Sequence, residues 1–416
     1  MEPEDNKMKA HQIFTAVSKY VFLTLMPVLF TGSVAFADPP GWTITQLTNN
    51  SYDDTNPQIS GTNVVWLGFD GSDFEVFFYN GSTTTQLTNN SYDDTNPQIS
   101  GTNVVWQGWD GPDWEIFFYN SSTTTQLTNN SYDDTNPQIS GSNVAWQGWD
   151  GSDGEIFFFN GSIGENTPLT NNDYDDTNPQ ISGSNVVWQG KVGYYWEIFF
   201  FNGSTTTQLT NNSCDDTNPQ ISGSNIVWQG HIVYGTLWSW EIFFYNGSTT
   251  TQLRISAFDD FNPQISGSNV IWQHLYWDAP ADVYLYNGST ITKLSFGNET
   301  PGNPQISGSN VVWAEYYYGN DSEIFIEKNF TANQLTNNSY DDANPQISGS
   351  NVVWQGQVGG LGNDWEIFLA KLNCPYELDG DLNYDCRVDF EDFAYLANNW
   401  LVDCIAEPSN PACVPK

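Results

Sequence analysis

The stretch Asn96-Pro97-Gln98-Ile99-Ser100-Gly101 decides the fold, because it recurs along most of the chain. The hexapeptide Asn-Pro-Gln-Ile-Ser-Gly occurs eight times, at intervals of 40 to 44 residues. Its copies begin at Asn56, Asn96, Asn136, Asn178, Asn218, Asn262, Asn303 and Asn344. A repeat of this period is typical of a propeller or a solenoid, in which every repeat is one small unit of secondary structure.

Each repeat contains four short runs of residues that favour strands. In the second repeat these runs are 96–100, 104–107, 115–120 and 123–128, and residues such as Gly, Asn and Ser separate them. β-Branched and aromatic residues between such turns are typical of a meander of antiparallel strands. Four strands per repeat predict one propeller blade per repeat.

The two ends of the repeat array predict a closed ring. The eighth repeat ends at 366–372 without its Thr-Gln-Leu-Thr strand, and one such strand stands alone at 43–48. The N-terminal strand should therefore complete the last blade, which removes an exposed sheet edge. We predict an all-β, eight-bladed propeller over 42–372, with seven blades as the alternative if the divergent repeat around Asn303 packs irregularly.

The first 37 residues have the order of a secretory signal peptide. Three lysines precede an apolar run over 20–30, and Ala35-Phe36-Ala37 forms an Ala-x-Ala cleavage site. A membrane anchor is the alternative, but Pro27 interrupts the run and no second apolar stretch follows. We therefore expect 1–37 to be a signal peptide, the mature chain to be secreted or on the cell surface, and no membrane insertion after cleavage.

The chain is strongly acidic, with a formal net charge of -39. Nucleic acids and anionic membranes require a cationic surface, so both are excluded as partners. Two roles for the carboxylates fit this charge. They keep the protein soluble, including in a saline habitat, or they bind calcium.

An Asp-Asp pair precedes most copies of Asn-Pro. The first pairs are Asp53/Asp54, Asp93/Asp94 and Asp133/Asp134, and they continue at Asp175/Asp176, Asp215/Asp216, Asp259/Asp260 and Asp341/Asp342. One Asp of each pair is expected to cap the turn by accepting backbone N–H groups. Some pairs could instead hold calcium, since this cation prefers carboxylate and carbonyl oxygens.

The hairpin loop between the second and third strand of a repeat carries extra aromatic residues. One Trp in each second strand is assigned to packing between blades, namely Trp66, Trp106, Trp146, Trp188, Trp228, Trp272, Trp313 and Trp354. The loop residues Trp109, Trp149, Trp238 and Tyr276 are surplus to that core. Clustered exposed aromatics often mark a binding surface, so these four are candidate ligand-binding residues; packing between neighbouring loops is the alternative.

A different pattern begins after Leu372. Oxygen ligands stand at the spacing of an EF-hand calcium loop, and the following residues have an apolar helical face. The predicted ligands are Asp381, Asn383, Asp385, Asp389, Asp392 and the carbonyl of Arg387. The sequence therefore predicts a small calcium-binding module, partly helical, over 374–416.

Five cysteines are unevenly distributed along the chain. Four of them, Cys374, Cys386, Cys404 and Cys413, lie in the C-terminal module, where an exported protein would form two disulfides. Cys374 with Cys386 and Cys404 with Cys413 is one of three possible pairings. Cys214 replaces the Tyr that precedes the Asp pair in other repeats, and we expect a free thiol with no role.

The residues from Asp381 to Asp392 resemble one calcium-binding half of a type I dockerin. Cys386 replaces the usual Gly at loop position 6, and only a single loop is visible. The resemblance implies a cohesin-like or cell-surface partner. The Asn-Pro-Gln-Ile-Ser-Gly, Val-Val-Trp-Gln-Gly and Glu-Ile-Phe segments make the blades similar to TolB-type and surface-layer-type propeller repeats of exported microbial proteins, over about 330 residues. That resemblance is specific for a fold and weak for an activity.

Two functions follow from these patterns. The first is a secreted, non-catalytic binding or scaffold protein, whose propeller binds a polysaccharide or protein ligand and whose calcium module docks it to a partner or cell surface. The alternative is an extracellular polysaccharide-degrading enzyme, a hydrolase or lyase. No catalytic residue is assigned, but a singular site would lie in the divergent hairpin loops that hold Lys191, His231 and His274.

Overall fold

The computed structural model describes residues 39, 41–234, 237–276, 280–294, 301–317, 321–328, 331–359 and 364–372. The chain divides into two compact units, Met1–Ala37 and Asp38–Lys416, and every described residue belongs to the second. The predicted signal peptide and the predicted calcium module lie outside the described residues. Within the described part, the secondary structure is entirely strand, and no helix there could span a membrane.

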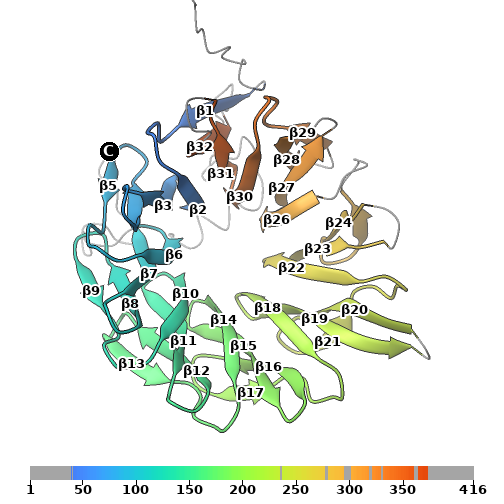
Figure 1. Ribbon diagram of the computed structural model, residues 1–416. Helices are drawn as coiled ribbons and strands as arrows, with labels where there is room; N and C mark the ends of the chain where they lie inside the picture. Colours follow the sequence, from blue (N-terminus) through green and yellow to red (C-terminus); the bar gives the residue numbers. More distant parts are fainter. Residues whose placement is uncertain are drawn as a thin grey trace, which may run out of the picture. The chain divides into compact units, whose positions relative to one another are not determined.

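The strands form eight four-stranded antiparallel sheets, so the predicted eight-bladed propeller is confirmed (Figure 1). Blade one contains β2 (Asp54–Ser60), β3 (Asn63–Phe69), β4 (Phe74–Tyr79) and β5 (Thr84–Gln86). Blades two to four contain β6 (Asp94–Ser100), β7 (Asn103–Trp109), β8 (Trp114–Tyr119), β9 (Thr124–Gln126), β10 (Asp134–Ser140), β11 (Asn143–Trp149), β12 (Gly154–Asn160), β13 (Glu165–Pro168), β14 (Asp176–Ser182), β15 (Asn185–Val192), β16 (Tyr195–Phe201) and β17 (Thr206–Gln208).

The remaining blades follow the same order. Blades five to seven contain β18 (Asp216–Ser222), β19 (Asn225–Tyr234), β20 (Leu237–Tyr245), β21 (Thr250–Gln252), β22 (Asp260–Ser266), β23 (Asn269–His274), β24 (Asp282–Tyr286), β25 (Ile291–Lys293), β26 (Pro301–Ser307), β27 (Asn310–Tyr317), β28 (Asp321–Lys328) and β29 (Thr331–Gln334). Blade eight contains β30 (Asp342–Ser348), β31 (Asn351–Gln357), β32 (Trp365–Leu372) and β1 (Trp42–Gln46). The repeat around Asn303 therefore forms a complete blade, and the seven-bladed alternative is wrong.

The N-terminal strand closes the ring as predicted. β1 pairs with β32 in antiparallel register, from Trp42 opposite Leu372 to Gln46 opposite Phe368. In Figure 1 the first strand of every blade lies innermost, and β1 lies at the outer edge of blade eight. The first and last strands of the described chain therefore share one sheet.

The recurring Asn-Pro step forms a bulge in each innermost strand. The register shifts between Thr55 and Gln58 in blade one, and the intervening Asn56 has a φ of 52°. All eight equivalent asparagines have a φ between 47° and 54°. Asparagine tolerates this left-handed conformation better than most residues, which explains why the repeat keeps Asn at that position.

The Ser-Gly turns join each blade to the next. The backbone N–H of Gly101 donates to the Ser60 hydroxyl of the preceding blade, at 2.8 Å. The same bond recurs at every interface and closes the circle between Gly61 and Ser348, also at 2.8 Å. Apolar residues fill the space between blades, as where Trp106 packs against Val65 and Phe78 of blade one. The predicted role of these tryptophans in packing between blades is confirmed.

Candidate functional site

The two residues of each Asp pair have different partners. The second Asp is buried, and in six blades it accepts a hydrogen bond from the indole Nε1 of the core Trp at 2.8 to 3.0 Å. Its other oxygen accepts the side-chain N–H of an Asn four residues earlier, such as Asn90 for Asp94. In these six blades, the bonds therefore fix the first residue of the innermost strand to the core Trp of the same blade.

The first Asp joins neighbouring blades. Asp93 accepts the backbone N–H of Phe74, which begins β4 of the preceding blade, at 3.0 Å. The equivalent bond recurs at six further interfaces, including that between Asp53 and Trp365. One Asp of each pair thus accepts a backbone N–H group, as predicted, but the predicted capping of its own turn is wrong: Asn90 Oδ1 accepts the N–H of Tyr92 in that turn, at 2.8 Å.

A glycine gives the buried Asp its space, and two blades replace it. A Cβ at Gly68 would lie 2.6 Å from Asp54 Oδ1, so a larger residue requires a different arrangement. In blade six, His274 takes the place of this glycine, and its Nδ1 lies 2.6 Å from Asp260 Oδ1. In blade seven the Asp is absent, and Glu315 accepts the Trp313 Nε1 bond instead, at 3.0 Å.

Burial disfavours the ionised form of the second Asp in these pairs. It raises the pKa of Asp216 to about 6 and that of Asp342 to about 7, from an ordinary value of 3.8. Because the folded chain holds these protons more tightly than the unfolded chain, the free energy of unfolding decreases as the pH rises through this range. The stability of the propeller is therefore linked to pH through groups in its core.

We expect the thermal midpoint to decrease between about pH 4 and about pH 7, measured in the presence of a chelator. The variant Asp342→Asn removes one buried charge at constant shape, so its midpoint should depend less on pH than that of the natural protein. A midpoint that rises over this range, or a slope that Asp342→Asn leaves unchanged, would contradict the destabilising effect assigned to the buried carboxylates.

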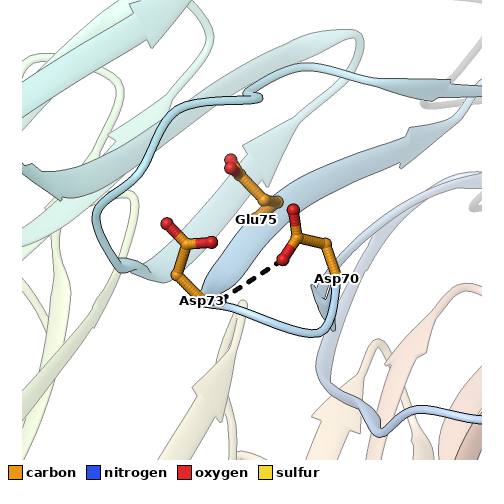
Figure 2. A group of neighbouring side chains, drawn as sticks. All are labelled: Asp70, Asp73 and Glu75. Atoms are coloured by element: carbon orange, nitrogen blue, oxygen red, sulfur yellow. Dashed lines mark hydrogen bonds between the residues drawn. The ribbon is translucent and has the colours of Figure 1, made fainter.

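A second group of carboxylates lies in the hairpin loops of blades one to three. Asp70, Asp73 and Glu75 bring one oxygen each within 4.8 Å of the others, and the three carboxylates face a common space (Figure 2). The same cluster forms from Asp110, Asp113 and Glu115 and from Asp150, Asp153 and Glu155. From the sequence, only the Asp-Gly turn was predicted at this place. The recurrence of Asp-Gly-x-Asp-x-Glu in three repeats could have indicated the carboxylate cluster.

The most spacious cleft described lies on blade five, with a volume of about 850 Å³. Equivalent clefts on blades three and one measure about 340 and about 270 Å³. Tyr132 and Tyr52 line those smaller clefts, whereas blade five has Cys214 at that position. The change from Tyr to Cys, together with the longer hairpin of blade five, explains the larger space, so Cys214 does contribute to the cleft.

His231 lies in this cleft between two tryptophans. Its ring centroid is 5.2 Å from that of Trp238 and 5.0 Å from that of Trp240. Its backbone N–H donates to the carbonyl of Asp215 at 2.7 Å, which fixes the strand on which it stands. Asp215 and Asp216 also line the cleft, while burial, followed by their negative charges, raises the pKa of the Cys214 thiol.

The four aromatic residues predicted to bind a ligand lie in four different blades. Trp149 and Trp238 are exposed, at 43% and 64%, and each lines the cleft of its own blade. Trp109 is only half exposed and packs edge-on against Trp114, with centroids 5.4 Å apart. Tyr276 donates to Asp282 Oδ2 at 2.7 Å and packs against His274. The first two remain open to a ligand, whereas the other two fit the packing alternative.

The basic residues predicted to mark a singular site, Lys191, His231 and His274, also differ in how accessible they are. Lys191 lies 5.7 Å from the ring centroid of Trp196 on blade four. His274 is fully buried and engaged with Asp260, which leaves His231 as the histidine available to a substrate within the described residues. The predicted calcium ligands Asp381, Asn383, Asp385, Arg387, Asp389 and Asp392, and the predicted disulfide cysteines, lie outside the described residues.

Comparison with known proteins identifies the fold but no sequence family. No protein-family model and no curated protein sequence matches the chain. Among solved structures, a prolyl endopeptidase is similar with a TM-score of 0.54 at 9% identity, over 75% of this chain and 55% of that one. A puromycin hydrolase is similar with a TM-score of 0.51 at 11% identity, over 73% and 58%. The propeller domain of the trilobed protease of Pyrococcus furiosus has a TM-score of 0.49 at 12% identity, over 69% and 96%.

This finding corrects the first of the two predicted functions. The solved propellers that this chain resembles belong to enzymes, which contradicts the prediction of a non-catalytic binding or scaffold protein. The chain spans just over half the length of the two enzymes with the higher scores. At these identities the likeness concerns the fold alone, so the activity has to be argued from the cleft.

Proposed function

We propose that the protein is an extracellular enzyme that hydrolyses a polysaccharide, and that its active site is the blade-five cleft. The observation that carries this proposal is the combination found there: an exposed Trp238, the singular His231 and the carboxyl groups of Asp215 and Asp216 line one cavity of about 850 Å³. The other seven blades repeat the carboxyl groups in part, but His231 has no counterpart at its position.

The chemistry of the cleft suits cleavage of a glycosidic bond. The exposed face of Trp238 offers a flat apolar surface for a sugar ring. Hydrolysis requires one group to protonate the departing oxygen and another to take a proton from water, so the two groups need unlike environments. Histidine is the side chain that most often transfers protons in enzymes, and the half-buried Asp215, which also lines the cleft, supplies the second group.

The charge of the chain favours hydrolysis over elimination. A lyase abstracts a proton beside the carboxylate of a uronic acid, so its polysaccharide substrate is anionic. A chain with a net charge of -39 repels such a polymer. We therefore infer a neutral polysaccharide as the substrate and water as the second reactant.

The two ends of the chain are proposed to serve export and docking. Residues 1–37 direct secretion, and the segment 374–416 is the dockerin-like module that binds calcium and a cohesin-like or cell-surface partner. The repeats belong with TolB-type and surface-layer-type propellers. These assignments rest on the sequence patterns, and a calcium titration of the variant Asp381→Asn separates the C-terminal loop from any other calcium site.

The full chain should release reducing ends from at least one neutral polysaccharide in a panel of glucans, mannans and xylans. His231→Gln is expected to lower kcat by about 10²–10⁴-fold, since it removes the proton-transfer group at nearly constant volume. Trp238→Ala should chiefly raise KM, because it removes the stacking surface. Reducing-sugar release over time measures both effects.

Trp149→Ala is the matched control, since Trp149 occupies the equivalent hairpin of blade three, which has no histidine. That variant should retain the activity of the natural protein. Cleavage of a peptide substrate with no action on any polysaccharide would overturn the proposed substrate class. If the His231→Gln variant had full activity, the active site could not lie in the cleft of blade five.

A further inference from the structure

The carboxylate clusters of blades one to three are not used by the proposed enzyme, and their surroundings indicate a separate role. Asp73 is 6% exposed and Glu75 is fully buried. Both carboxylate oxygens of Asp73, and Oε2 of Glu75, are buried without a hydrogen-bond partner. A buried carboxylate without a partner is unfavourable, so an arrangement repeated in three blades favours a bound cation.

We propose that each of these three hairpin loops binds one calcium ion. In the first loop the ligands are the free oxygens of Asp70, Asp73 and Glu75. The equivalent ligands are Asp110, Asp113 and Glu115 in the second loop, and Asp150, Asp153 and Glu155 in the third. Calcium is a hard cation that takes 6–8 oxygen ligands and accepts carboxylates, carbonyls and water together.

The carboxylates of Asp70 and Glu75 are held in place by backbone N–H groups, and each keeps an oxygen free. Asp70 Oδ1 accepts the backbone N–H of Ser72 at 2.8 Å, which leaves Oδ2 available. Glu75 Oε1 accepts the backbone N–H of Asn90 at 2.7 Å, which leaves Oε2 available. Asp73 lies between them, and its carbonyl accepts the backbone N–H of Asp70 at 3.1 Å. The loop is therefore organised before an ion arrives, so binding requires little rearrangement.

Within the described residues, no lysine or arginine forms an ion pair with these clusters. The ion pairs found there are His274 with Asp260 and Lys293 with Asp282, both in blade six. The compensating charge must therefore come from solution.

Blades five and six have another residue at the position of Asp73 or Glu75. In blade five, Ser239 stands in place of Asp73, and its hydroxyl donates to Glu241 Oε1 at 3.1 Å. In blade six, Asp282 stands in place of Glu75, and Lys293 lies 2.7 Å from it. What distinguishes blades one to three is the additional buried carboxylate of Asp73, Asp113 and Asp153, which has oxygens without a hydrogen-bond partner beside the free Glu oxygen.

The test is the number of calcium ions bound per chain. We expect calorimetric titration of calcium chloride into the chelator-treated full chain to show three ions beyond the one expected of the C-terminal loop. The combined variant Asp73→Ser, Asp113→Ser, Asp153→Ser copies the residue found in blade five, so it should fold. It should lose those three ions, and calcium should raise its thermal midpoint less than that of the natural protein.

Two control variants assign the bound ions. Asp364→Ser changes the equivalent position of blade eight, where the carboxylate is half exposed, and should leave the count unchanged. Asp381→Asn should remove only the ion of the C-terminal loop. The proposal is overturned if the combined variant binds as much calcium as the natural protein, or if Asp381→Asn abolishes all binding. Polysaccharide cleavage is not involved in this measurement, so its outcome is independent of the proposed activity.

Discussion

Trp106→Ala is expected to lower the free energy of unfolding by about 3–5 kcal/mol from lost packing alone. The indole is 1% exposed, stacks on Phe117 at 5.8 Å, and contacts the apolar side chains of blade one. Its removal also takes the Nε1 donor from the buried Asp94, which adds about 1–3 kcal/mol. Denaturant unfolding of the full chain, followed by circular dichroism, measures the change.

Two further variants separate these contributions. Trp106→Phe keeps an aromatic ring but removes the donor, so it should cost clearly less than Trp106→Ala while still leaving Asp94 without that partner. Trp109→Ala removes a tryptophan from the same strand at its half-exposed end, and should cost about 0.5–1.5 kcal/mol. If Trp106→Ala cost no more than Trp109→Ala, the central packing role assigned to the core tryptophan would be wrong.

Deletion of residues 41–46 is expected to make the propeller aggregate. This deletion removes β1, including Trp42, which is buried against blades seven and eight. It exposes the N–H and C=O groups of β32, and an unpaired edge strand readily pairs with other chains. The loss of Trp42 packing alone amounts to about 3–5 kcal/mol. Light scattering after size-exclusion chromatography reports the aggregation.

Peptide rescue provides the matching control. A synthetic peptide of residues 39–48 should restore the size of the natural protein by adding a strand to β32, in the manner of β-strand augmentation. The point variant Gln46→Ala changes an exposed side chain of β1 and should have no effect on the size of the protein. A deletion variant with the same size and stability as the natural chain would show that β1 contributes nothing to closure.

Sequence patterns predicted the fold well because the determinants are local and repeated. The number of blades follows from the eight copies of Asn-Pro-Gln-Ile-Ser-Gly, and closure follows from the unpaired strand around Trp42. Even the left-handed Asn56 fits a residue type that tolerates this conformation. These features depend on residues that are close in the sequence or on the number of repeats, so a single sequence is sufficient to predict them.

The candidate sites were harder to predict, because they depend on contacts between blades. Asp93 caps Phe74 across a blade boundary, and the partner of Asp94 is an indole 12 residues away. In the sequence the two residues appear only as an Asp-Asp pair, and nothing in the pattern indicates that they have different partners. Cys214 was expected to have no role, since the space that it opens is visible only when the Tyr rings of other blades are seen lining theirs.

The pairing of β1 with β32 has a consequence for the order of events during synthesis. Asn50, just after β1, bonds to Glu366 of the last blade, 316 residues later in the chain. At about 5–20 residues per second, the ribosome needs roughly 15 to 60 seconds to supply that partner. β1 must therefore stay unpaired while the following blades are translated, so the ring can close only after the last blade has been made.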